Sequence, residues 1–253
     1  MVIRQLDEGR KKSVIANKYA TLIINSILNK KDKFAIELDE EDKKFVAYDD
    51  IFVERSTNKP GIGQALSAKA ELQPHSDGWR LNVEVTYLDT FSRKDFQFAH
   101  LVLAELLTHE YTHGGSIASS DKDIKSIEDY YRDVKTIYGK AYPEISKEIE
   151  SLLNELPSYR DGKKIPAMNA RDRQAIRAYA KSGEIEAFIQ GWMKTFKTKK
   201  QSRRYENEFS NMIFSKLDQF KNRLLDPEHP NIQKIMDLLF KEYESYYKSR
   251  YHK

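Results

Sequence analysis

The chain has 253 residues, which is enough for one large domain or two small ones with a sizeable core. Its 40% hydrophobic and 32% charged residues, with 7 prolines and 10 glycines, exclude the disordered, collagen-like and low-complexity classes. A net charge of +4 neither requires nor excludes a nucleic-acid partner. Cysteine is absent, so disulfides and a thiol nucleophile are excluded, and any metal must be bound by His, Asp or Glu.

Neither a targeting segment nor a membrane span is expected from the sequence. The first residues include acidic side chains and lack the apolar stretch of a secretory signal. The most apolar segment, 99–107, is interrupted by His100 and Glu105 and has about half the length that a membrane span needs. We therefore expect a protein that stays in a cytoplasm, that of its own cell or of a host, with no membrane partner.

The first third of the chain combines one helical pattern with several extended ones. Apolar residues in 11–29 recur at helical spacing. Short segments with strand-like composition follow at 34–38, 48–53, 68–72 and 79–88. In the last of them Leu81, Val83 and Val85 alternate with polar residues, the pattern of a strand with one buried face. We expect an N-terminal helix followed by a small, mostly antiparallel sheet.

From Asp95 onward the apolar residues recur at helical spacing throughout. The predicted helices are 95–114, 123–139, 142–156, 170–181, 183–197, 202–223 and 230–250. The sequence therefore predicts an α+β fold in which helices dominate. We expect one domain over 1–253, with the helix and sheet in 1–90 and a helical part in 91–253.

Residues 109–113 read His-Glu-Tyr-Thr-His, an H-E-x-x-H motif. On a helix His109 and His113 share one face, so both imidazoles can reach a single zinc ion. Glu110 lies beside them, where its carboxylate can accept a proton from a metal-bound water. The preceding segment 96–107 is apolar almost all round, which is typical of a buried helix, and histidines buried there without partners would be costly. The alternative interpretation is a pair of histidines that hydrogen-bond to neighbouring groups.

The segment Leu106–Gly114 resembles the active-site helix of the zincin metallopeptidases, and the resemblance extends over about residues 80–195. It implies Zn²⁺ held by His109 and His113, and hydrolysis of peptide bonds with Glu110 as the general base. It also implies that the strand Leu81–Leu88 is the sheet edge that, in zincins, holds an extended substrate by backbone pairing.

Zincins are divided by their third metal ligand. The metzincin pattern needs Gly at position 116 and His at position 119, where this chain has Ser116 and Ser119. Asp121 and Asp123 lack the setting found in aspzincins. The chain is therefore most similar to the gluzincins, in which a glutamate from a second helix completes the site.

Glu184 and Glu186 compete for the place of that third ligand. The gluzincin pattern E-x-x-A fits Glu184 and Ala187, although Phe188 stands where an acidic residue is common. Glu184, Ala187 and Gly191 form a stripe of small residues along which another helix can approach, whereas Glu186 lies on the polar face. We favour Glu184 as the ligand; a carboxylate stabilised only by the helix dipole is the alternative interpretation.

Several other features have a functional and a purely structural interpretation. Tyr179 resembles the tyrosine that lethal-factor-like gluzincins place upstream of their ligand for oxyanion stabilisation, but it can equally be a packing residue. The basic run 194–204 is more typical of a solvated helix end than of a phosphate-binding surface. The tyrosines of 243–253 favour helix packing over base stacking, and Trp79 and Trp192 are expected in the core.

Three functions are compatible with these patterns. The first is a zinc metallopeptidase acting on a peptide or protein substrate, which the intact Glu110 favours. The second is a zincin fold kept as a binding or structural module, for instance in a virus particle, with a retained zinc site and little hydrolysis. The third, not favoured, is a basic helical nucleic-acid-binding protein with structural zinc.

Overall fold

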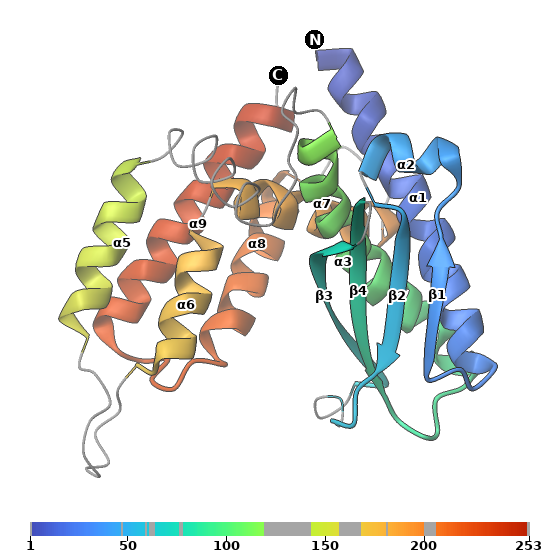
Figure 1. Cartoon of the computed structure of the whole chain (residues 1–253). Helices are drawn as coiled ribbons and strands as arrows, with labels where there is room; N and C mark the ends of the chain where they lie inside the picture. The colour runs from blue at the N-terminus through green and yellow to red at the C-terminus, as the bar shows by residue number, and fades with distance from the viewer. Residues whose placement is uncertain are drawn as a thin grey trace. The chain divides into compact units, whose positions relative to one another are not determined.

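The computed structural model shows an α+β fold (Figure 1). It describes residues 2–46, 48–58, 60, 64–75, 78–118, 143–156, 168–180, 182–199 and 206–251. The chain forms two compact units: unit 1 comprises Met1–Tyr131 and Gln190–Lys199, and unit 2 comprises Arg132–Ile189 and Lys200–Lys253. One continuous helix, α7 (Ser182–Lys199), contributes its first half to unit 2 and its second half to unit 1.

Unit 1 contains a four-stranded sheet in the order β1-β2-β4-β3. The strands are β1 (Lys33–Glu37), β2 (Asp50–Arg55), β3 (Leu66–His75) and β4 (Gly78–Tyr87). Two pairings are antiparallel, β1 with β2 and β3 with β4, while β2 and β4 run parallel with Ile51 opposite Leu81. The expected small, mostly antiparallel sheet is confirmed.

The expectation that Leu81–Leu88 forms the sheet edge is wrong. That segment corresponds to β4, which pairs with β2 on one side and β3 on the other, so it is an internal strand. The alternation of its residues reports one buried face of the strand and carries no information on how many neighbours the strand has. The edges of the sheet are β1 and β3.

One face of the sheet is covered by two long helices, α1 (Val2–Leu28) and α3 (Phe96–Ala118), as Figure 1 shows. Side chains from the sheet and from both helices are almost completely buried there, among them Ile51, Val53, Leu81, Val83, Ile23, Ile24, Leu103 and Leu107. The 3-10 turn η1 (Arg93–Asp95) leads into α3, and the side chain of Asp95 accepts a hydrogen bond from the backbone N–H of Ser92 (2.9 Å). Helix α3 is therefore held in the core of unit 1.

A short helix that was not predicted, α2 (Glu40–Val46), follows β1. Three acidic residues lie in its first turn, where the helix dipole favours them. The hydroxyl of Tyr19 donates to the carboxylate of Asp42 (3.0 Å), and the ammonium of Lys18 lies 2.6 Å from the same carboxylate. These contacts to α1 stabilise a seven-residue helix that would be too short to be stable in isolation.

Unit 2 is helical in its described part. It consists of α5 (Pro143–Glu155), α6 (Ala170–Tyr179), α8 (Glu206–Lys221), α9 (Pro230–Tyr251) and the first half of α7. Asn169 caps α6 by accepting the backbone N–H of Asp172 (2.8 Å), and the guanidinium of Arg173 donates to the carbonyl of Leu156 (2.9 Å) just beyond α5. Apolar side chains of α8 and α9, such as Phe209 and Leu239, are fully buried.

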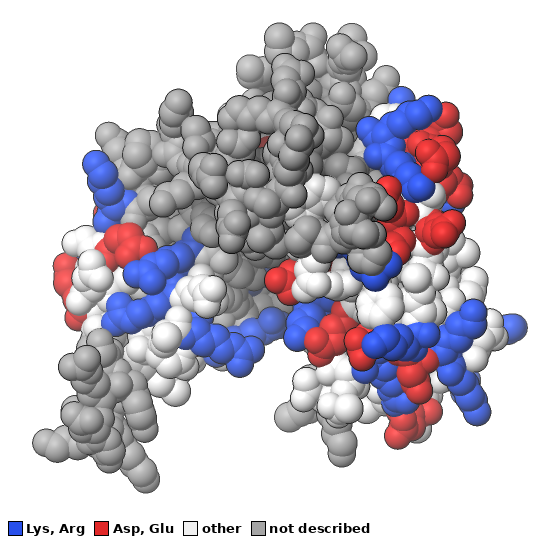
Figure 2. All heavy atoms as spheres, viewed as in Figure 1, with Lys and Arg blue, Asp and Glu red and all other residues white. Residues whose placement is uncertain are grey.

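Each predicted helix in the described residues is present. The N-terminal helix begins nine residues earlier than expected, at Val2, and the other boundaries shift by a few positions. The predicted helix 123–139 lies outside the described residues. Figure 2 shows that Lys and Arg side chains on the described part of one face are interspersed with Asp and Glu.

No helix of the described residues is long and apolar enough to span a bilayer. Trp79 and Trp192 are buried as expected.

Candidate metal centre

Helix α3 brings the two histidines of the motif together. Leu103, Leu107 and Tyr111, spaced by four residues, are fully buried and form the core-facing side of the helix. A step of two residues turns a helix by about 200°, so His109 and His113 point away from that side. Their Nε2 atoms lie 3.2 Å apart, and their rings meet edge to face with centroids 4.9 Å apart.

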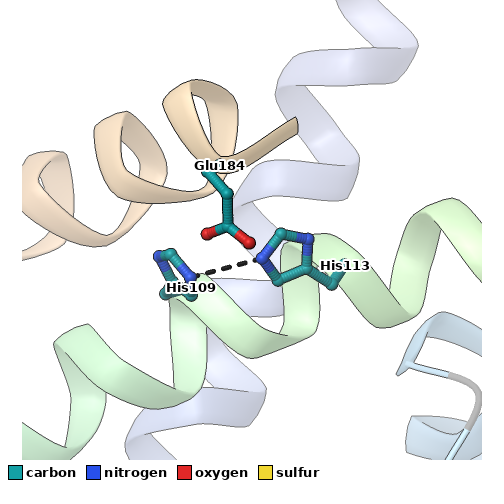
Figure 3. Close-up of side chains that lie close together, drawn as sticks. All are labelled: His109, His113 and Glu184. Atoms are coloured by element: carbon teal, nitrogen blue, oxygen red, sulfur yellow. Dashed lines mark hydrogen bonds between the residues drawn. The ribbon is translucent and has the colours of Figure 1, made fainter. Parts of the chain in front are cut away.

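Glu184, in the first turn of α7, completes a group of three possible ligands. One atom each from His109, His113 and Glu184 lie within 4.8 Å of one another. Figure 3 shows the carboxylate of Glu184 directed at both imidazole rings. Glu186 is not part of this group, which is the one set of three or more potential ligands found among the described residues.

The second half of α7 approaches α3 closely at Gly191. A Cβ atom at this position would lie 3.0 Å from the backbone oxygen of Glu105 and 3.6 Å from the Cβ of His109. Ala187, one turn earlier, is fully buried. Glycine therefore allows the approach, as the predicted stripe of small residues implied. Glu184 lies on the same continuous helix, seven residues before Gly191, which is about 10 Å along the helix axis.

The separation of the two imidazole nitrogens fits a tetrahedral metal. With Zn–N bonds of about 2.0 Å, two ligands of a tetrahedral ion lie about 3.3 Å apart. The 3.2 Å between the Nε2 atoms matches that edge. The three possible ligand atoms of the full set lie within 4.8 Å of one another. A tetrahedral metal held by two histidines and one glutamate would keep a fourth coordination position open, as catalytic zinc sites do.

Glu110 lies next to this group. Its Oε1 is 4.0 Å from Nε2 of His109, and its side chain is 12% exposed. The backbone carbonyl of Glu110 accepts a hydrogen bond from the hydroxyl of Tyr48, whose ring packs against that of Tyr111 with centroids 5.7 Å apart. Tyr48 thus anchors the turn of α3 that carries Glu110.

The two threonine hydroxyls of the motif helix are paired locally, whereas the hydroxyl of its tyrosine is not. The hydroxyl of Thr108 donates to the carbonyl of Ala104 (2.7 Å), and that of Thr112 to the carbonyl of Thr108 (2.8 Å). The hydroxyl of Tyr111 is buried and has no hydrogen-bond partner among the described residues. Burial raises the pKa of Tyr111 well above its ordinary value, so this phenol stays protonated.

No protein-family model, curated protein or solved structure matches this chain. What the chain does must therefore be inferred from the chemistry of its own side chains.

Other residues singled out in the sequence take part in packing. The ring of Tyr179 lies against Phe188 and Phe220, with centroids 4.4 Å and 4.0 Å away. Lys194, the first residue of the basic run, donates to the hydroxyl of Ser13 on α1 (2.6 Å). Tyr247 stacks on Phe209 at 4.0 Å, so this tyrosine of the C-terminal segment packs as expected. Residues 200–204 of the basic run lie outside the described part.

No sequence pattern marks two tyrosines whose hydroxyls bind distant backbone carbonyls. Tyr48 hydrogen-bonds to Glu110 from a position 62 residues away, and Tyr243 donates to the carbonyl of Tyr179 (3.0 Å). In a chain with 15 tyrosines, neither stands out by spacing or composition.

Proposed function

We propose that this chain is a zinc-dependent peptidase of the gluzincin type. His109, His113 and Glu184 hold the metal, and Glu110 is the general base. The observation that carries the proposal is the convergence of three possible ligand atoms within 4.8 Å. The 3.2 Å between the two Nε2 atoms is a hydrogen-bond distance and also the spacing of two ligands on a tetrahedral ion. A bound zinc ion would supply Lewis-acid polarisation of the scissile carbonyl and would lower the pKa of water.

The chain's own residues then perform the proton transfers. Glu110, with its carboxylate 4.0 Å from His109, accepts the proton of the attacking water and delivers it to the nitrogen of the departing amine. Its partial burial favours this role, because few water molecules compete for the carboxylate. Tyr48 holds the backbone of Glu110 in place through the hydrogen bond to its carbonyl.

An extended substrate could pair with β3. The resemblance to zincins assigns substrate pairing to an edge strand, and β3 is an edge of the sheet and packs against α3. A peptide or protein is therefore the substrate class that we propose.

The position of Glu110 favours hydrolysis over a purely structural zinc site. A metal that only stabilises the fold needs no carboxylate beside an open coordination position. Among the described residues, the interspersed charges on the face in Figure 2 and the contact of Lys194 with Ser13 do not favour the nucleic-acid alternative.

The proposal is tested by metal analysis combined with a peptidase assay. The purified chain should retain about one zinc per chain after reconstitution and dialysis, and His113→Ala should not. Cleavage of an unfolded protein substrate should depend on zinc and be abolished by a chelator. Metal content near zero would overturn the proposal. Stoichiometric zinc without cleavage of any peptide library would favour the structural module instead.

A further inference from the structure

Four aromatic side chains meet in unit 2, each from a different helix. Tyr179 ends α6, Phe188 lies on α7, Phe220 on α8 and Tyr243 on α9. The ring of Tyr179 stacks on Phe188 and on Phe220, and Phe188 packs against Tyr243 with centroids 6.4 Å apart. Tyr243 is fully buried. We call these four residues the aromatic cluster.

The aromatic cluster is joined to the start of α7 at two points. The hydroxyl of Tyr243 donates to the backbone carbonyl of Tyr179 (3.0 Å), one of the carbonyls that the end of α6 leaves without a helical partner. Glu184 follows Tyr179 by five residues. Phe188 lies one helical turn after Glu184, on nearly the same side of α7. Stacking on Phe188 therefore fixes the rotation of the turn that carries the carboxylate.

Tyr243 lies within electrostatic reach of that carboxylate. Burial raises the pKa of its hydroxyl well above the ordinary value, and the charges of Tyr179 and Glu184 act in the same direction. The hydroxyl is therefore a neutral donor at any pH at which a peptidase works, and its bond to Tyr179 persists over that range.

We infer that Tyr243 is a positioning residue for Glu184 and thereby sets the metal affinity of the site. This inference rests on the proposed function. Phe188 stands where gluzincins commonly have an acidic residue, so this chain holds its ligand helix by aromatic packing and one buried hydrogen bond. Groups that orient metal ligands typically contribute 10- to 100-fold in affinity, which sets the scale of the expected effect.

The experiment measures the affinity for Zn²⁺ with a competing chelator, using the full chain. Tyr243→Phe keeps the ring and removes only the hydrogen bond, and it should weaken zinc binding about tenfold. The control Tyr247→Phe makes the same change one turn later on α9, where the ring stacks on Phe209, and should leave affinity within about twofold of the parent. Co²⁺ in place of zinc reports the coordination geometry through its visible absorption, which should change in Tyr243→Phe and not in Tyr247→Phe.

A double substitution separates positioning from general loosening of the fold. If Tyr243 acts through Glu184, then Tyr243→Phe should cost little further affinity in a Glu184→Gln background. An equal loss in both backgrounds would overturn the inference, as would a parent-like affinity in Tyr243→Phe. A parent chain that binds no zinc would overturn the proposed function as well. Should Tyr243→Phe fail to fold, Phe188→Leu removes the stack instead, and unchanged zinc affinity in that variant would contradict the inference.

Discussion

Helix α3 and the first turn of α7 contribute to the same group of side chains by different physical routes. His109 and His113 are brought together by the geometry of a single helix, and any helix with this spacing would place their rings side by side. Glu184 comes from another helix, α7, which passes close to α3 at Gly191 and carries Phe188 of the aromatic cluster. The two candidate ligands on one helix are therefore close through local geometry, whereas the position of the third candidate depends on tertiary packing.

The largest effect is expected at Glu110, which belongs to α3 but is not a ligand. Glu110→Gln is isosteric, so zinc content and thermal stability should stay at the parent's level. Turnover of a peptide substrate should fall by about 10²- to 10⁴-fold, the usual contribution of a general base. The assay needs equal zinc occupancy in both proteins, measured directly. Equal turnover in variant and parent would exclude the proposed mechanism.

The contrast between the histidine pair of α3 and the glutamate of α7 predicts a ranking of zinc affinities among alanine variants. His109→Ala should cause a greater loss than Glu184→Ala, which should itself weaken binding by more than about tenfold. Glu186→Ala is the matched control on the same helix and should bind zinc nearly as the parent does. Competitive chelator titration of the three variants gives the order. A larger loss from Glu186→Ala than from Glu184→Ala would show that the other glutamate is the ligand.

The close approach of α7 and α3 can be tested by adding one methyl group. In Gly191→Ala the new Cβ would lie 3.0 Å from the carbonyl oxygen of Glu105. Overpacking of this kind costs about 1–3 kcal/mol, of which the better helix propensity of alanine returns about 1 kcal/mol. We expect a net destabilisation of up to about 2 kcal/mol in urea unfolding. Asn211→Ala, at an exposed position of α8, should instead be neutral or slightly stabilising.

The smallest effect distinguishes two neighbouring tyrosines of unit 1. Tyr48→Phe removes the hydrogen bond to the carbonyl of Glu110 and should destabilise by about 1 kcal/mol. Tyr111→Phe removes a buried hydroxyl that has no partner among the described residues, so it should be neutral or stabilising by up to about 1 kcal/mol. Thermal unfolding of both variants measures this difference. Equal destabilisation by the two substitutions would contradict the conclusion that only the Tyr48 hydroxyl makes a stabilising hydrogen bond.

The sequence alone was enough to predict those features of the fold and the candidate site that depend on residues close together in the chain. The period of the apolar residues predicts α3, α6 and α9, and the H-E-x-x-H spacing predicts the proximity of the two imidazoles. The choice of Glu184 over Glu186 for this group also needed only the pattern of α7. Glu184 lies on the same side of that helix as Gly191, where another helix can approach closely.

Features that depend on distant parts of the chain were missed. Helix α2 is short and highly charged, and its contacts to α1 come from residues more than twenty positions away. The internal position of β4 depends on the parallel pairing with β2, which the pattern of one strand does not encode. Tyr243 acts across 64 residues of chain to reach Tyr179.

The position of β3 at the end of the sheet has a consequence for self-association. An edge strand presents backbone N–H and C=O groups to which a strand of another molecule can add. On β3 the side chains of Lys69 and Glu71 are exposed, and Pro74 lacks the backbone N–H that a continuous ladder would need. A second copy adding in register would face charged side chains and a missing donor. We therefore expect β3 to resist assembly into long intermolecular sheets.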